Sequence, residues 1–347
     1  MRLRTLLLAL TVLPLPVWAL SPDELRTDAP SVYTVKKGDT LWDIAATFLD
    51  DPWRWEELWD RNAYISNPDL IYPGDRLLLR IVDGEPRLTR QRVERLSPEA
   101  EEKPVQRLEA ISTVDTSVVV PFLGRYGIVD PGNEPTDRGG YLVAGQNERA
   151  MYATGDRVFT RLKEPEGLED PTAQDWHSYK EPEAIRDPDS GAHLGYLLRH
   201  TGTLTMEGPT GDGLFASRVE RTFAPVEAGN HLYPADGDYE ARFTPKAAPD
   251  VEGRVLRHVD KESLVGQGQI VVLNLGTRDG LEKGHVLRVQ GSSRSVDDPQ
   301  RWGSAELPGR NKGTLLVFQT GKRLSFAMIM SNSRAIAPRD RVVSPER

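Results

Sequence analysis

The sequence predicts an α+β protein with a small strand–helix–helix–strand module, a linker, and a mainly β C-terminal region of small barrel-like subdomains. Three patterns predict this architecture. Residues 32–80 place two helical apolar repeats between short alternating runs. Residues 81–117 alternate in charge and contain few aromatic side chains. After residue 118, branched runs recur between clusters of Gly, Asp and Pro, which is typical of strands joined by turns.

The composition excludes several classes of function. The chain has 347 residues, a formal net charge of −8 and no cysteine. The absence of cysteine excludes thiol nucleophiles, Cys-ligated zinc or iron–sulfur sites, disulfides and the acylated cysteine of a lipoprotein. An acidic balance argues against nucleic-acid binding, which needs a clustered basic face. We therefore expect no nucleic-acid partner and no cofactor.

Residues 1–19 have the features of a cleaved export signal. Arg2 and Arg4 precede an apolar stretch, and Val17-Trp18-Ala19 fits a small-residue cleavage site. A membrane anchor is the alternative, but a span needs about 20 apolar residues and two prolines interrupt this stretch. Nothing later in the sequence reaches transmembrane length. We expect an exported, wall-associated periplasmic protein.

The module at residues 32–80 is predicted element by element. Residues 32–35 alternate as a strand, and Gly38 permits the turn that follows. Thr40 and Asp43 fit a helix-capping box ahead of an apolar stripe at helical spacing. Asp51-Pro52 begins a second helix, because proline is tolerated at the first helical position. A rigid turn at residues 67–75 then leads into a strand at residues 76–81.

Two motifs in this module carry a family resemblance. They are Tyr33-Thr34-Val35 with Gly38-Asp39-Thr40-Leu41-Trp42 and Ile44-Ala45, and then Asn67-Pro68 with Leu70-Ile71 and Pro73-Gly74-Asp75. Both motifs resemble the LysM domain, and their separation fits that domain as well. LysM domains bind glycans that contain N-acetylglucosamine, chiefly peptidoglycan in bacteria. The resemblance implies a glycan groove between the first strand–helix loop and the loop before the last strand.

Carried over position by position, the resemblance assigns nine glycan-binding residues. One wall of the groove is formed by Gly38, Asp39, Thr40 and Leu41. The other wall is formed by Asp69, Leu70, Ile71, Tyr72 and Pro73. The physical case agrees, since turns with exposed backbone groups and the apolar side chains of Leu70 and Ile71 can read an uncharged sugar. Gly38 and Pro73 also shape their turns whether or not a ligand binds.

The segment between the helices is richer in aromatic residues than a generic LysM domain. Four of the seven tryptophans are Trp42, Trp53, Trp55 and Trp59. Such rings stack on sugars, dock proteins or close a small core. We favour core packing for most of them, and we expect Trp53 to be the exposed member and an accessory glycan contact.

The C-terminal half is predicted to form two β-rich subdomains, residues 118–245 and residues 250–347. Nine strands are expected, at residues 141–144, 157–161, 194–202, 214–223, 253–259, 269–274, 286–290, 313–319 and 325–332. Residues 163–192 and 291–310 are rich in Pro, Asp and Gly, so we expect mobile loops there. Within the linker, helices at residues 90–96 or 105–111 are alternatives to a solvated spacer.

This half resembles one group of exported LysM proteins. The matching stretches are Val251 to Val255, Gly268 to Leu287, Gly313 to Thr320, Ser325 to Met330 and Asp340 to Val342. The group is the secretin-associated LysM proteins of type IV pilus systems. The resemblance implies that the protein binds peptidoglycan and holds an outer-membrane secretin in the wall. Because one LysM domain of modest affinity anchors little alone, we also expect several copies around the partner. Arg339 stands where such proteins usually have glycine.

Catalysis is the main alternative, because many LysM proteins are wall hydrolases. The six histidines, expected at surfaces or turns, form no H-x-H or H-E-x-x-H zinc pattern. No serine lies in a G-x-S-x-G elbow, and no acidic pair lies in a recognisable lytic motif. We therefore predict no catalytic or metal-binding residues and a non-catalytic adaptor. A peptidoglycan hydrolase, or a wall adaptor for the flagellum or a secretion system, remains the alternative.

Overall fold

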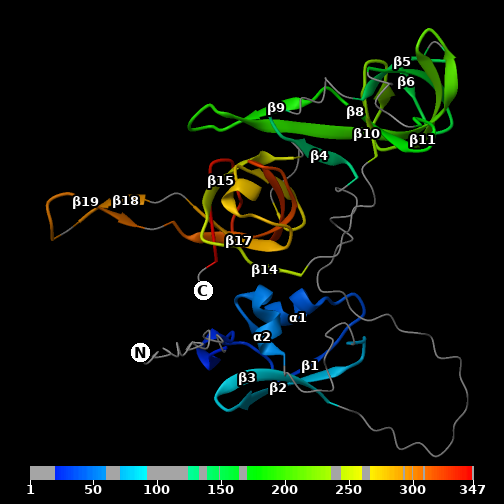
Figure 1. Cartoon of the computed structure of the whole chain (residues 1–347). Helices are drawn as coiled ribbons and strands as arrows, with labels where there is room; N and C mark the ends of the chain where they lie inside the picture. Colours follow the sequence, from blue (N-terminus) through cyan, green and yellow to red (C-terminus); the bar gives the residue numbers. More distant parts are fainter. Residues whose placement is uncertain are drawn as a thin grey trace, which may run out of the picture. The chain divides into compact units, whose positions relative to one another are not determined.

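The computed structural model groups the chain into two compact units, residues 1–114 and residues 115–347 (Figure 1). It describes residues 20–59, 71–91, 124–132, 139–147, 149–163, 170–235, 244–259, 266–291, 294–298, 300–307 and 309–345. The predicted export signal at residues 1–19 and the linker at residues 92–117 lie outside the described residues. In the described ranges, no helix has both the length and the apolar character needed to cross a membrane.

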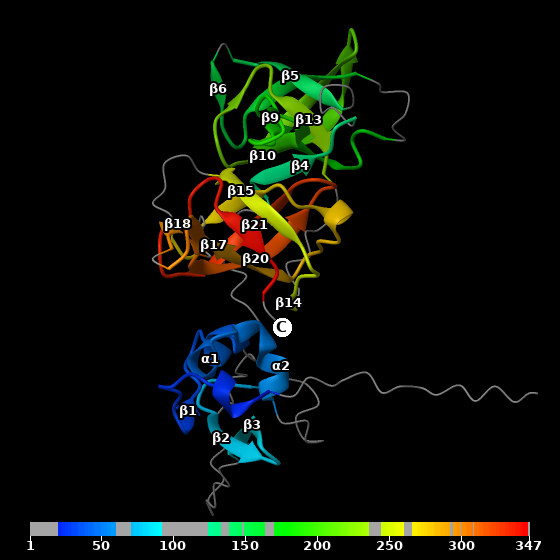
Figure 2. The same cartoon turned by 90° about the vertical axis from the view of Figure 1, so that its left-hand side faces the viewer.

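The first unit is a three-stranded antiparallel sheet covered on one face by short helices (Figure 2). Its strands, in the order β1–β2–β3, are β1 (Val32–Thr34), β2 (Arg76–Val82) and β3 (Glu85–Gln91). Its helices are η1 (Pro22–Glu24), α1 (Leu41–Phe48), η2 (Pro52–Arg54) and α2 (Trp55–Leu58). The predicted strand–helix–helix–strand order is confirmed, with a one-turn 3-10 helix leading into the second helix.

One apolar core lies between the sheet and the helices. Its buried members are Leu20, Val35, Leu41, Ile44, Ala45, Phe48, Leu49, Trp55, Leu58, Trp59, Ile71, Leu77 and Leu88. The helical spacing of residues 41, 44, 45 and 48 therefore identifies the buried face of α1 correctly. Tyr33 packs edge-on against Phe48, with ring centroids 6.3 Å apart.

The linker does not begin at residue 81 as predicted, because β3 continues the sheet. Asp83 and Gly84 both have positive φ, 53° and 87°, and form the two-residue loop of a hairpin. Leu88 in β3 is completely buried in the core of the first unit. Leu88 stands among charged and polar residues in β3, so the sequence pattern does not identify it as a core position.

The N-terminal segment at residues 20–29 also belongs to this unit. Leu20 is 2% exposed, and Leu25 forms a bridge with Leu49 at the end of α1. Arg54 in η2 donates to Glu24 of this segment and to Glu57 in α2. The folded unit therefore extends beyond residues 32–80 on both sides.

The described residues of the second unit form two closed six-stranded barrels, which confirms the predicted barrel-like subdomains. The first barrel contains β5 (Gly140–Gly145), β7 (Arg157–Leu162), β8 (Asp175–Tyr179), β10 (His193–Gly211), β11 (Leu214–Thr222) and β13 (His231–Pro234). It closes because β10 pairs with both β8 and β11. Beside it, β6 (Met151–Tyr152) pairs with β12 (Val226–Glu227).

The expectation of a loop at residues 163–192 is wrong for its described part. This stretch contributes β8 to the barrel and also forms β9 (Glu183–Arg186). Trp176 in β8 is completely buried in the core of the first barrel. A single tryptophan among polar neighbours gives little alternation, so only the pairing with β10 and β13 places this strand.

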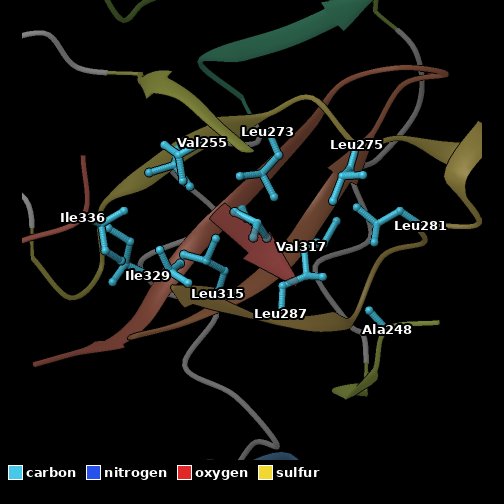
Figure 3. Packing of buried hydrophobic residues seen from close by; sticks show 14 residues of the cluster. Ala248, Val255, Leu273, Leu275, Leu281, Leu287, Leu315, Val317, Ile329 and Ile336 are labelled. Atoms are coloured by element: carbon cyan, nitrogen blue, oxygen red, sulfur yellow. The ribbon is translucent and has the colours of Figure 1, made fainter. Parts of the chain in front are cut away.

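The second barrel has a core of closely packed apolar side chains (Figure 3). Its strands are β15 (Glu252–His258), β16 (Ile270–Leu273), β17 (His285–Gln290), β20 (Asn311–Thr320), β21 (Ser325–Asn332) and β22 (Arg341–Val343). Pairing of β17 with β22 closes it, while β14 (Lys246–Ala247) lies parallel to β17 and η5 (Thr277–Asp279) follows β16. Leu287, Leu315, Val317 and Ile329 point into its interior (Figure 3).

A hairpin interrupts the predicted loop at residues 291–310. Strands β18 (Arg294–Asp297) and β19 (Ser304–Leu307) pair antiparallel with each other and with no barrel strand. The hairpin projects away from the second barrel in Figure 1. The expectation of an irregular loop here is therefore wrong for the described residues.

The long strand β10 links the two barrels within the second unit. Its first part pairs with β4 (Tyr126–Val129) and β9, and its second part belongs to the first barrel. Polar contacts attach this region to the second barrel, including Asn274 to Asp187 at 3.0 Å and Arg254 to Asp189 at 2.7 Å. The two barrels are therefore joined by side-chain contacts as well as by the chain.

Candidate functional site

The turn after β1 presents main-chain groups to solvent. Gly38 adopts a φ of 96°, a backbone conformation that side chains rarely tolerate, and is exposed. The neighbouring main-chain N–H groups of Lys37 and Gly38 form no hydrogen bond in the described part of the first unit. Two exposed donors therefore lie at the predicted glycan-binding turn.

Asp39 holds this turn rather than facing solvent freely. One of its carboxylate oxygens accepts hydrogen bonds from the Lys36 main chain at 2.7 Å and from the Tyr33 hydroxyl at 2.9 Å. Burial, together with the hydrogen bond to Asp39, raises the pKa of Tyr33 to about 12. Tyr33 therefore stays a neutral donor at physiological pH, and it fixes the shape of the turn.

Thr40 is the predicted N-cap of α1, and the structure confirms it. The Thr40 hydroxyl accepts from the Asp43 main chain at 3.1 Å, and Asp43 in return accepts from the Thr40 main chain at 3.1 Å. Thr40 is only 3% exposed. Its side chain is therefore occupied in capping the helix.

The second turn, immediately before β2, is built in a similar way. Gly74 adopts a φ of 97°, and the Asp75 carboxylate accepts from the Tyr72 main chain at 3.1 Å. Tyr72 and Pro73 are half-buried and Gly74 is exposed. Two acidic side chains, Asp39 and Asp75, thus stabilise two turns that both contain a left-handed glycine.

Val35, directly after β1, connects the two turns through main-chain hydrogen bonds. Its main-chain N–H donates to Asp75 at 2.9 Å, and its carbonyl accepts from Gly74 at 2.8 Å. Because β1 ends where β2 begins, both turns lie at the same end of the sheet. The arrangement is a short, rigid surface of exposed backbone groups between two turns.

Two of the predicted glycan-binding residues have side chains that the core buries, so only their main-chain groups could face a ligand. Leu41 and Ile71 are each 1% exposed, so their side chains belong to the core. The prediction that the Ile71 side chain contacts sugar is therefore wrong for this conformation. Asp69 and Leu70 lie outside the described residues.

Trp53 is not the exposed aromatic that the sequence suggests. It is 6% exposed, because η2 packs against α1 and carries the ring inward. Trp55 and Trp59 are buried as well, and their indole N–H groups have no hydrogen-bond partner in this part of the chain as the structure describes it. Core packing, the role favoured for most of these rings, is confirmed for Trp55 and Trp59, whereas the expected exposure of Trp53 is wrong.

The histidines give no support to a metal centre in the second unit. Among the described residues, no cluster of three or more His, Asp or Glu is arranged to hold a metal ion.

His200 is 4% exposed and its ring lies 4.3 Å from that of His177, so its expected surface position is wrong. Burial lowers the pKa of His177 to about 4 and also lowers the pKa of His200. His285 begins β17, is 6% exposed and accepts from the Glu282 main chain, so its expected surface or turn position is wrong as well.

Two linked turns, a capped helix and a small antiparallel sheet define a compact βααβ binding module. Residues 33–80 match the family model of the LysM domain. This stretch of the chain is therefore a LysM domain, as its two motifs predict. LysM domains bind the cell wall, so the module indicates binding to peptidoglycan.

One curated relative has significant similarity. A 59-residue stretch is 56% identical to the protein named "Uncharacterized protein YqbP" from Bacillus subtilis (strain 168). The match covers 14% of this chain and 27% of that protein. The chain thus spans about a quarter of the relative it matches, and the similarity is confined to a short segment.

Proposed function

We propose that this protein is a non-catalytic periplasmic adaptor, in which the LysM domain binds peptidoglycan and the barrels hold a protein partner. The observation that carries the first part is the linkage of two glycine-containing turns through Val35. Exposed N–H groups at Lys37 and Gly38 match the carbonyl of an acetamido group, and half-buried Tyr72 and Pro73 offer an apolar surface. Gly38, Asp39, Thr40, Leu41 and residues 69–73 are the proposed binding segment.

A sacculus pull-down tests this part of the proposal. Tyr72→Ala should reduce retention on purified peptidoglycan, because Tyr72 lines the proposed groove without belonging to the core. Tyr196→Ala, a half-buried tyrosine of the second unit, is the matched control and should bind like the original protein. Equal retention after deletion of residues 20–91, the whole first unit as the structure describes it, contradicts wall binding by LysM.

The second part of the proposal concerns the hairpin formed by β18 and β19. Trp302 lies between these strands, and its side chain is completely exposed, at 108% of the reference area. Exposed tryptophan at the end of a projecting hairpin favours protein docking, since buried aromatic anchors dominate binding energy in many interfaces. By resemblance to the secretin-associated group, the proposed partner is an outer-membrane secretin of a type IV pilus system.

Crosslinking in cells and identification of the captured protein tests the partner. Trp302→Ala should reduce capture of the secretin while leaving the unfolding temperature unchanged, because the side chain is fully exposed. Met151→Ala removes another exposed apolar side chain, 57% exposed, and serves as the control. Capture of a flagellar or secretion-system protein instead favours the alternative adaptor role.

The number of protein copies on the partner determines how strongly the complex is held to peptidoglycan. A single LysM domain of modest affinity anchors little alone, but many copies around a ring-shaped partner gain avidity through effective concentration. We therefore propose an oligomeric display on the partner. Release of soluble muropeptides from sacculi by the purified protein contradicts the non-catalytic part and favours a hydrolase.

A further inference from the structure

The face of the LysM sheet that points away from the helices carries a strip of arginines. Strand alternation and register place one set of side chains on this face, which we term the outer sheet face. Its members are Val32, Thr34, Arg76, Leu78, Arg80, Val82, Glu85, Arg87 and Thr89. The helices cover the opposite face (Figure 2).

Two of these arginines oppose each other directly across the sheet. Arg80 in β2 pairs in register with Arg87 in β3. Like charges in directly opposite positions destabilise a sheet. Arg87 lies 3.0 Å from Glu85, whereas Arg80 is exposed and has no ion-pair partner among the described residues. The unfavourable pair therefore leaves one guanidinium free to bind an anion.

Arg76 extends the strip to the end of the sheet that carries the two turns. It is exposed, lies opposite Gln91, and likewise has no ion-pair partner in the described residues. It directly follows Asp75 of the second turn, and Arg80 lies four residues further, about 13 Å along the strand. The strip therefore starts at the proposed glycan groove and leads away from it.

The remainder of the described unit carries more acidic than basic side chains, although Lys36, Lys37 and Arg90 are exposed outside the outer sheet face. Asp43, Glu56 and Glu57 are exposed on α1 and α2. On the outer sheet face the described residues include one carboxylate, Glu85, and it is already paired with Arg87. The outer sheet face is thus net positive in a protein whose net charge is −8.

We propose that the outer sheet face binds the carboxylate-bearing stem peptide of the same peptidoglycan strand whose glycan lies in the turns. This inference rests on the proposed function of the LysM domain. Stem peptides bear several carboxylates on short, mostly small side chains, and four or five extended residues span about 13–18 Å. That length matches the path from Arg76 to Arg80, and Leu78 and Val32 offer apolar contacts beside it.

Three ligands separate the peptide contact from the glycan contact. They are intact sacculi, sacculi stripped of stem peptides by an amidase, and a neutral chito-oligosaccharide. The double variant Arg76→Gln/Arg80→Gln should bind intact sacculi about three- to tenfold more weakly, the sum of two exposed charge contacts. Its affinity for stripped sacculi and for the oligosaccharide should not change. For the original protein, added salt should weaken binding to intact sacculi more than binding to stripped ones.

Arg26→Gln is the matched control, because it removes one positive charge from the same unit but belongs to the N-terminal segment and pairs with Asp28. It should bind all three ligands normally. Equal affinity of the original protein for intact and stripped sacculi overturns the inference while leaving glycan binding in place. Failure of the original protein to bind any of the three ligands overturns the proposed function itself. An equal loss on all three ligands by the double variant, with unchanged unfolding temperature, also counts against a peptide-specific face.

Discussion

The ammonium group of Lys312 lies 2.7 and 2.8 Å from the two carboxylate oxygens of Asp340, and Asp340 is 5% exposed. Asp340 also accepts from the Ala337 main chain at 2.7 Å. The pair joins β20 to the turn before β22, the strand that closes the second barrel. This ion pair thus attaches the turn before the closing strand β22 to β20.

Removal of the cation from this pair should destabilise the second barrel. Lys312→Met leaves Asp340 charged and buried, so the free energy of unfolding should fall by about 2–3 kcal/mol, less than for a fully buried pair because Lys312 is partly exposed. Lys246→Met, which breaks the exposed pair with Glu282, should change the free energy of unfolding much less, because solvent screens exposed ion pairs. Urea unfolding compares the two, and equal losses contradict a special role for Lys312.

Arg339 adopts a φ of 73°, in the left-handed region that favours glycine. Arg339→Gly should raise the free energy of unfolding by about 0.5–1 kcal/mol, because relief of left-handed strain exceeds the added chain entropy of glycine. The lost contact from Arg339 to the Pro188 carbonyl is exposed and offsets little. Arg334→Gly, at a position without positive φ, should instead lower the free energy of unfolding. Calorimetry of both variants measures the two changes, and a loss of stability in Arg339→Gly contradicts the prediction.

Leu88 tests whether β3 belongs to the LysM core. Leu88→Ala should cost about 2–4 kcal/mol, because it opens a cavity in a fully buried site. Ile81→Ala, 55% exposed on the preceding strand, should cost less than about 1 kcal/mol. The tryptophans of this unit report its unfolding by fluorescence. Similar small losses for both variants contradict the assignment of β3 to the core.

The contact between the barrels should weaken in acid through Asp187. The hydrogen bond from Asn274, with those from the main chain and hydroxyl of Ser190, lowers the pKa of Asp187 to about 2. Because the folded pKa lies below the unfolded value, the stabilisation is present above pH 4 and is lost as pH falls from about 4 to about 2.

Asp187→Asn tests this assignment. Asp187 is half-buried, so the contribution after solvent screening is about 1 kcal/mol or less. The stability difference between Asp187→Asn and the original protein should be present at pH 6 and vanish near pH 2. Unfolding temperatures measured from pH 2 to pH 6 check it, and a constant difference across this range contradicts it.

Sequence patterns locate the LysM domain and nine strands of the second unit, with small shifts in their ends except for β10, which continues to Gly211 beyond its predicted end at residue 202. Their success has a common cause, since each rests on local chemistry such as the Thr40 cap or a run of branched residues between turns. They fail at β3, β8 and the β18–β19 hairpin, which have few apolar residues. Strand β8 forms because β10 and β13 supply its hydrogen bonds, whereas β3, β18 and β19 each pair with the neighbouring strand of a hairpin.

The sequence alone determined the two turns of the LysM domain, because Gly38, Gly74 and the acidic side chains beside them act on their own backbone. The tertiary structure decided which side chains remain available. Trp53 and Ile71 turn into the core, while Arg76 and Arg80 stay on the outer sheet face. Burial depends on how helices and sheet pack, and barrel closure depends on pairing between strands distant in sequence. Neither property is encoded in a local run of residues.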